Sequence, residues 1–233
     1  MYEKFNNIEM KKLTIIFLLF SLAVKGQSSN DSTAISNTEN ASYLNGDLTK
    51  ILKKLTRYPV EEASKGVKGD VVISFNIMAD GKIDSLIIVS SPSKRLSANS
   101  LISFDQLKGK WSPYKVNGRP INKKYLLVFR YRYYLDTSPP EYKKKAAQFI
   151  SKEKYDKALK VLNKAIKDNK YDYTLFELRS KVKEKLGDIK GSKTDFEKVL
   201  HLKSEIISLV KVDMIGKMRR ELKYKTETRT IRN

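Results

Sequence analysis

The chain has 233 residues, of which 40% are hydrophobic, and a formal net charge of +21 at pH 7. This length suits two modest domains of roughly 100 residues each and a tail. The sequence has no cysteine and a single histidine, His201. Disulfides, thiolate metal sites, cysteine nucleophiles and a histidine metal cluster are therefore excluded. The positive charge makes nucleic acid, anionic lipid and acidic glycopolymer candidate partners, and a merely solvated basic surface is the alternative.

The first 26 residues have the layout of an export signal. Lys11 and Lys12 precede an apolar run at 13–24, and small and polar residues follow it. The run is shorter than the roughly 20 residues of a membrane-spanning helix. We predict a signal peptide over 1–26, with Met10 as a second candidate start, and a periplasmic protein. The alternative is an inner-membrane anchor, if the signal is uncleaved. Residues 27–46 are rich in Ser, Asn and Thr and are predicted to be a flexible spacer.

Residues 47–137 combine helical and strand patterns, which indicates a small α+β domain. The spacing of leucines predicts a helix over 47–56, with Asp47 as its N-cap. The alternating segment 71–78, the Asp80-Gly81 turn and a return strand over 83–90 predict a hairpin. The remaining expected elements are a helix over 96–107 and a last strand over 123–134. Together they predict a helix-covered, three-stranded antiparallel sheet.

The last strand has two readings. Aromatic and apolar residues on one side alternate with residues that run from apolar to basic on the other. This pattern fits a core strand with charged residues guarding an open edge. It also fits an edge that accepts an added strand from a partner.

The same segment resembles the C-terminal domain of TonB, the periplasmic energy transducer of outer-membrane transport. The matching residues, in order, are Tyr58-Pro59, Ala63, Gly66, Gly69, Val71, Val72, Phe75, Asp80-Gly81, Ser90-Ser91, Trp111, Pro113, Val116, Asn117-Gly118, Pro120 and Phe129. The resemblance implies a module that docks an extended segment of an outer-membrane receptor by strand addition. It places partner-binding residues at Arg57, Tyr58, Tyr125, Leu127, Phe129 and Tyr131. Trp111 and Pro113 are expected to be structural.

Beyond a linker at Ser138-Pro139-Pro140 the pattern becomes helical and repeats. The residue pairs Tyr155/Ile189, Ala158/Ser192, Leu162/Phe196 and Ala165/Val199 are each 34 positions apart. This is the period of the tetratricopeptide repeat (TPR), which the segment 138–222 resembles. We expect helices near 139–151, 155–168, 173–186 and 189–202, a capping helix at 205–222 and a basic tail at 223–233. The resemblance implies protein binding on a concave face, and the alternative is a spacer or a stabilising appendage.

No motif for catalysis is present in the sequence. Glycine-rich phosphate loops, paired-histidine metal motifs and nucleophile elbows are missing, and adjacent carboxylates such as Glu61-Glu62 are usually solvated. We therefore expect no enzyme activity, no cofactor, no metal and, because of export, no nucleic-acid partner. The function predicted is a periplasmic TonB-like module that docks a receptor or another envelope protein, with a TPR-like scaffold for a second partner. The alternative is a structural scaffold that binds anionic envelope polymer. Strand exchange at the last strand would give a homodimer.

Overall fold

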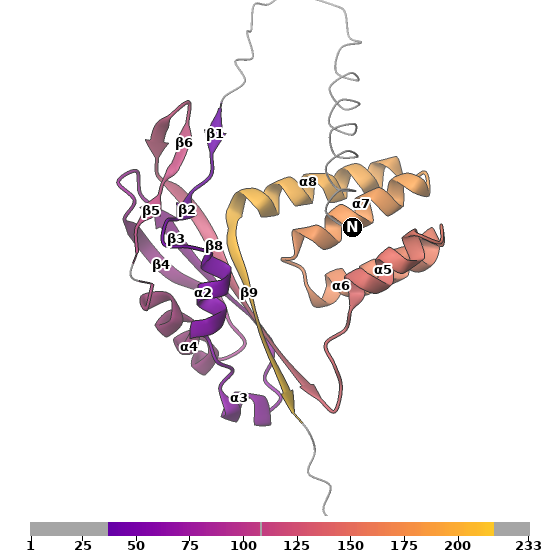
Figure 1. The fold of residues 1–233 in the computed structure, drawn as a ribbon, viewed down its shortest axis with the longest axis horizontal. Helices are drawn as coiled ribbons and strands as arrows, with labels where there is room; N and C mark the ends of the chain where they lie inside the picture. The colour runs from indigo at the N-terminus through magenta and orange to yellow at the C-terminus, as the bar shows by residue number, and fades with distance from the viewer. Residues whose placement is uncertain (1–36, 108, 217–233) are drawn as a thin grey trace, which may run out of the picture. The chain divides into compact units, whose positions relative to one another are not determined.

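The computed structural model describes residues 37–107 and 109–216, which belong to one unit of the chain (Figure 1). The predicted signal peptide, the first ten residues of the predicted spacer and the basic tail lie outside the described residues. The elements in chain order are β1 (Thr38–Glu39), β2 (Ser42–Tyr43), α2 (Leu48–Leu55), α3 (Val60–Ser64), β3 (Gly69–Ile77), β4 (Ile83–Ser90), α4 (Lys94–Asp105), β5 (Trp111–Ser112), β6 (Tyr114–Val116), β7 (Arg119–Ile121), β8 (Lys123–Leu135), α5 (Tyr142–Ile150), α6 (Tyr155–Asp168), α7 (Tyr173–Lys185), α8 (Ile189–Glu205) and β9 (Ile206–Gly216).

The main sheet has four strands in the order β4-β3-β8-β9. Strand β3 pairs antiparallel with β4 on one side and with β8 on the other, where the register runs from Gly69 opposite Tyr131 to Ile77 opposite Lys123. The predicted hairpin turn is present. Gly81 has a φ of 80°, a conformation that glycine adopts without steric cost, and its amide donates to the carbonyl of Met78 at 2.8 Å.

The fourth strand corrects the prediction of a capping helix at 205–222. Helix α8 ends at Glu205, and β9 begins at the next residue and runs parallel to β8. Val210 and Val212 point into the core at every second position, and β-branched residues at that period favour a strand. The sheet is therefore mixed and four-stranded, where three antiparallel strands were predicted.

The helices α5–α8 form the connection between β8 and β9. Neighbouring parallel strands require a crossover of a dozen or more residues, because a tight turn cannot reverse the chain and bring it back in the same direction. Here the crossover is the whole helical segment. It is thus inserted between two adjacent strands of one sheet, and Figure 1 shows β9 beside β8.

One face of the sheet carries the principal core. Helix α2 begins at Asp47, whose carboxylate accepts the Lys50 amide at 3.0 Å, and it buries Leu48 and Leu52. Helix α4 begins at Ser93 and buries Leu96 against the same core. Both helices have a side-chain cap, and Asp47 is the one predicted from the sequence.

Part of the predicted flexible spacer is ordered. Strand β1 pairs with β6, and β2 pairs with β5. The ring of Tyr43 lies 5.1 Å from that of Trp111, which in turn lies 5.9 Å from Phe75 in the core. Residues 38–43 are therefore held by the fold, since aromatic contacts offset their ordering entropy.

The four helices of the crossover lie where helices were predicted. Ala158, Leu162 and Ala165 of α6 are fully buried in a second core with Leu175 and Val182 of α7. Helices α7 and α8 are joined through the buried Asp195. Its carboxylate accepts both Arg179 Nε, at 2.8 Å, and Arg179 Nη2, at 2.6 Å, and Lys183 Nζ lies 2.9 Å away. Such paired contacts are geometrically specific and fix how the two helices pack. In the part of the chain that the structure describes, no helix is long and apolar enough to cross a membrane.

Candidate functional site: the outer edge of strand β8

Strand β8 places most of the predicted partner-binding residues in the core. The side chains of Tyr125, Leu127, Phe129 and Tyr131 alternate along the strand and all belong to the principal core cluster. Leu127, Phe129 and Tyr131 have no solvent-exposed surface. A partner could therefore reach these four residues only through their backbone.

The two buried tyrosines are anchored by hydrogen bonds. The hydroxyl of Tyr131 accepts from Asn99 Nδ2 at 2.8 Å and lies 2.9 Å from Ser100 Oγ. Burial raises the pKa of Tyr131 above its ordinary value, while its bonds to Ser100 and Asn99 act in the opposite direction. Tyr125 accepts the amide of Ala41 at 3.3 Å, and burial also raises the pKa of Tyr125. Both hydroxyls are neutral, and their hydrogen bonds hold the two rings in the core.

Arg57 and Tyr58 lie beside Tyr131. The rings of Tyr58 and Tyr131 are 5.3 Å apart at nearly a right angle, and Tyr58 donates its hydroxyl proton to the carbonyl of Val67. Asn99 links Arg57 to Tyr131, because its side-chain amide donates both to the Arg57 carbonyl and to the Tyr131 hydroxyl, each at 2.8 Å. Of the six predicted residues, Arg57 alone is exposed. The structure thus brings Arg57, Tyr58 and Tyr131 together at the Tyr131 end of the β3–β8 ladder.

The outer edge of β8 is covered by the chain itself. Strand β9 follows it over ten register pairs, from Leu126 opposite Ile206 to Leu135 opposite Gly216. With β3 on its other side, β8 is paired on both edges between Leu126 and Tyr131. This strand was not predicted, because residues 206–216 fall within the capping helix predicted at 205–222. The alternation of Ser208, Val210 and Val212 with Leu209, Lys211 and Asp213 was the signal for a strand.

The opposite face of β8 carries a group of buried charges. Arg130 is only 3% exposed, and its Nε lies 3.7 Å from Oδ1 of Asp70, which is also 3.0 Å from Arg132 Nη2. Burial lowers the pKa of Arg130, and Asp70 acts in the opposite direction. Nε and Nη2 of Arg130 have no hydrogen-bond partner among the residues that the structure describes. Two guanidinium groups therefore share one carboxylate.

Arg130 and Arg132 line an open cavity of about 830 Å³. Strand β9 contributes Lys211, whose pKa burial lowers, and Asp213, whose pKa burial raises. Basic residues around the cavity outnumber acidic ones. The basic residues are Lys68, Arg130, Arg132, Lys143, Lys144, Lys167 and Lys211, and the acidic residues are Glu141, Asp168, Asp172 and Asp213. Such a cavity favours anionic groups.

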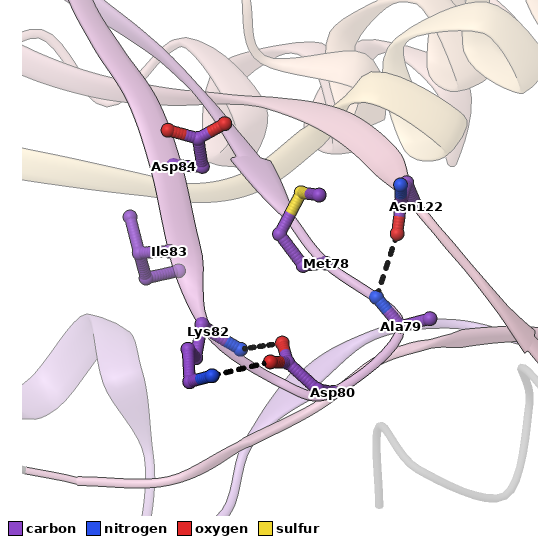
Figure 2. Close-up of a pocket in the computed structure, with 7 residues that line it drawn as sticks. All are labelled: Met78, Ala79, Asp80, Lys82, Ile83, Asp84 and Asn122. Atoms are coloured by element: carbon purple, nitrogen blue, oxygen red, sulfur yellow. Dashed lines mark hydrogen bonds and ion pairs between the residues drawn. The ribbon is translucent and has the colours of Figure 1, made fainter.

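A second, shallower hollow lies at the tip of the β3–β4 hairpin, as Figure 2 shows. The Asp80 carboxylate lies 2.7 Å from Lys82 Nζ, and hydrogen bonds from Lys82 lower the pKa of Asp80. Asn122 accepts the amide of Ala79 at 2.7 Å. These contacts hold the turn, and none of the six predicted site residues lines the hollow. Within residues 37–107 and 109–216, no group of three or more His, Cys, Asp or Glu side chains could hold a metal ion.

Comparison with known proteins gives one family. Residues 54–133 match the model described as the Gram-negative bacterial TonB protein C-terminal family. No curated protein matches the chain. Among solved structures, the solution structure of the TonB C-terminal domain of Helicobacter pylori is similar, with 21% identity and a TM-score of 0.26, over 35% of this chain and 74% of that chain. The segment from the end of α2 to Tyr133 of β8 is thus the part of this chain that matches the TonB C-terminal family.

Proposed function

We propose that residues 54–133 are a TonB-like protein-interaction module that binds an extended segment of an outer-membrane receptor in transmembrane transport. The family match supports a role in receptor interaction and transport. Strand addition is the proposed binding mode, and the observation that carries it is that the edge of β8 accepts a strand over ten register pairs.

In the proposed site, the backbone of β8 and the side chain of Arg57 bind the partner in different ways. The backbone of Tyr125, Leu127, Phe129 and Tyr131 would supply the donors and acceptors of the ladder, because their side chains are committed to the core. Arg57, exposed beside Tyr58, would contact the partner directly. Helices α5–α8 are proposed as a TPR-like scaffold for a second envelope protein. The proposed location is the periplasm, through the export signal, or the inner-membrane surface if that signal is uncleaved.

The test uses the full mature chain and a labelled synthetic peptide with the sequence of the extended N-terminal segment of an outer-membrane receptor from the same cells. Fluorescence anisotropy should show saturable binding that changes little between 50 and 300 mM salt, because a backbone ladder carries few charges. A peptide with proline at alternate positions is the control, since proline removes backbone donors. Equal binding of the two peptides would contradict strand addition.

A second candidate function is a structural scaffold bound to anionic envelope polymer. The cavity lined by seven cations and four acids is the observation that favours it. Binding of this kind should weaken steeply with salt and be indifferent to the peptide's sequence. A salt titration of binding to a soluble polyanion such as heparin, compared with the receptor peptide, separates the two functions.

A further inference from the structure

Strand β9 occupies the place that a docked partner segment would take. Its ten register pairs with β8 use the edge on which strand addition is proposed. It is also the outermost strand, since the sheet order ends with it. Strand β9 therefore shows what kind of strand this edge accepts and in which direction, parallel to β8.

The inward side of β9 has a defined pattern of side chains. Ser208 is buried, and its hydroxyl lies 2.8 Å from the hydroxyl of Thr49 on α2. Val210 and Val212 follow at alternate positions in the core, and Met214 packs against it. The edge thus accepts a small residue opposite Thr49 and then β-branched apolar residues at the next two inward positions.

The outward side of β9 is much less constrained. Lys211, Asp213 and Ile215 alternate with the inward residues, and Ile215 is 58% exposed. Lys211 and Asp213 face the charges around Arg130 and the acid Asp172. A segment with mixed charges at these positions is therefore tolerated, and the recognition pattern lies on the inward side.

The two ends of β9 are held differently. Its first residue continues directly from α8, which ties that end to the helical crossover. At its other end Gly216 accepts the amide of Asp136 at 2.9 Å, beyond the last register pair. β9 is paired along one side only, so its separation would break the β8–β9 ladder and uncover Val210 and Val212, while the β3–β8 ladder would stay paired.

We infer that β9 is an internal occupant of the docking edge, and that a partner binds by displacing it. The partner segment is extended, runs parallel to β8, and has a small residue followed at alternate positions by β-branched apolar residues. This inference rests on the proposed function of the β8 edge and adds the partner's sequence pattern and the step that frees the edge.

The first test weakens β9 inside the full chain and offers its sequence from outside. The probe is a labelled peptide with the sequence of residues 206–216. In the wild-type chain the tethered strand outcompetes it, because its effective concentration is on the order of millimolar. Val212→Asp places a charge in the core, so this chain should bind the peptide about tenfold more tightly than the wild type, or better. Ile215→Asp is the matched control on the exposed side and should bind like the wild type.

The outcomes of this test are distinct. Circular dichroism first establishes that the Val212→Asp chain retains its helices and sheet. A folded Val212→Asp chain that binds the peptide no better than the wild type overturns the inference. So does equal gain from Ile215→Asp, since the pattern would then not reside on the inward side.

The second test locks β9 in place and does not depend on a destabilised variant. The chain has no cysteine, and Tyr134 and Ile215 are register partners near the end of β9 away from α8. The double variant Tyr134→Cys, Ile215→Cys can therefore form a single disulfide, because neighbouring strands are close enough for one. The receptor peptide of the preceding section should bind the reduced chain and bind the oxidised chain about tenfold more weakly, or not at all.

Failure of the inference and failure of the proposed function give different results. Equal affinity of the receptor peptide for the oxidised and reduced forms overturns displacement of β9, while receptor binding stands. If the receptor peptide binds neither form but the 206–216 peptide binds the Val212→Asp chain, the sequence pattern stands and the proposed receptor function is overturned.

Discussion

At the scale of single residues, Asp70 is the acid on which the buried charges of the sheet depend. Its carboxylate lies between Arg130, which is almost fully buried, and Arg132. A buried charge without a counter-charge costs several kcal/mol, whereas a buried pair replaced by apolar groups costs little. The two sides of the ion pair are therefore not equivalent to mutation.

We expect Asp70→Asn to lower the free energy of unfolding by about 3 kcal/mol, because it leaves two guanidinium groups together without their carboxylate. Arg130→Met should lower it by less than about 1 kcal/mol, because the Asp70–Arg132 pair remains and the methionine fills most of the volume of the arginine side chain without its charge. Urea unfolding of both variants measures the difference. Equal losses would show that Asp70 does not compensate the buried charge of Arg130.

Single residues also show why the candidate site was only partly predictable. The alternation along β8 correctly indicated that Tyr125, Leu127, Phe129 and Tyr131 share one face, and the core-strand reading of that face agrees with their burial. The strand edge could not be assessed from those residues. Whether it is open depends on a segment about 80 positions away, and the sequence pattern of β8 contains no information about its neighbour.

At the scale of elements, the sequence pattern predicted the limits of those helices and strands that depend on neighbouring residues in the chain. The helix at 155–168 and the strand at 83–90 have the predicted limits, because the hydrophobic period sets the helix and the Asp80-Gly81 turn sets the start of the strand. Residues 206–216 were assigned to a helix from the expectation that a repeat array ends in a cap. Their β-branched residues at period 2 favour a strand, and pairing with β8 completes it.

Strand β4 is the other outermost strand of the main sheet, and it exposes apolar side chains. Ile87 is 55% and Val89 56% exposed, and β3 is the only strand that pairs with β4 among the residues that the structure describes. Apolar edge strands template association with other chains. Strand exchange at the last strand of segment 47–137 was the predicted route to a homodimer, but β9 covers that edge. We therefore predict self-association through β4.

We therefore expect the wild-type chain to self-associate at high concentration and the double variant Ile87→Lys, Val89→Lys to remain monomeric. Sedimentation velocity over a concentration series measures this. Val60→Lys, at an exposed apolar residue of α3, is the control and should associate like the wild type. Surface changes of this kind alter stability by no more than about 0.5 kcal/mol, so the fold is retained. Association of the double variant at wild-type concentrations would exclude β4 as the interface.

At the scale of the whole molecule, the sheet and the helices are interdependent. The crossover α5–α8 lies between two strands of one sheet, and α6 and α7 bury a core of their own. A cut within the crossover therefore leaves both fragments with large contact surfaces. The two segments that resembled separate modules in sequence share a sheet.

A protease site engineered into the turn at Ser151–Lys154 tests this interdependence. After cleavage, the two fragments should elute together in gel filtration and separate only in denaturant, because β9 remains paired with β8 and α5 remains packed on α6. The uncut variant is the control for any effect of the inserted site. Separation of the fragments in native buffer would show that the parallel ladder contributes little to cohesion.

The parallel pairing of β8 with β9 also sets an order in time. The ribosome synthesises β3, β4 and β8 before helices α5–α8, and β9 after them. Leu126 can therefore pair with Ile206 only after 80 more residues have been synthesised. Contacts between such distant residues form late, because a long loop must first close. During synthesis the edge of β8 is therefore bare, and a strand from another molecule has its easiest access to this protein before the chain is complete.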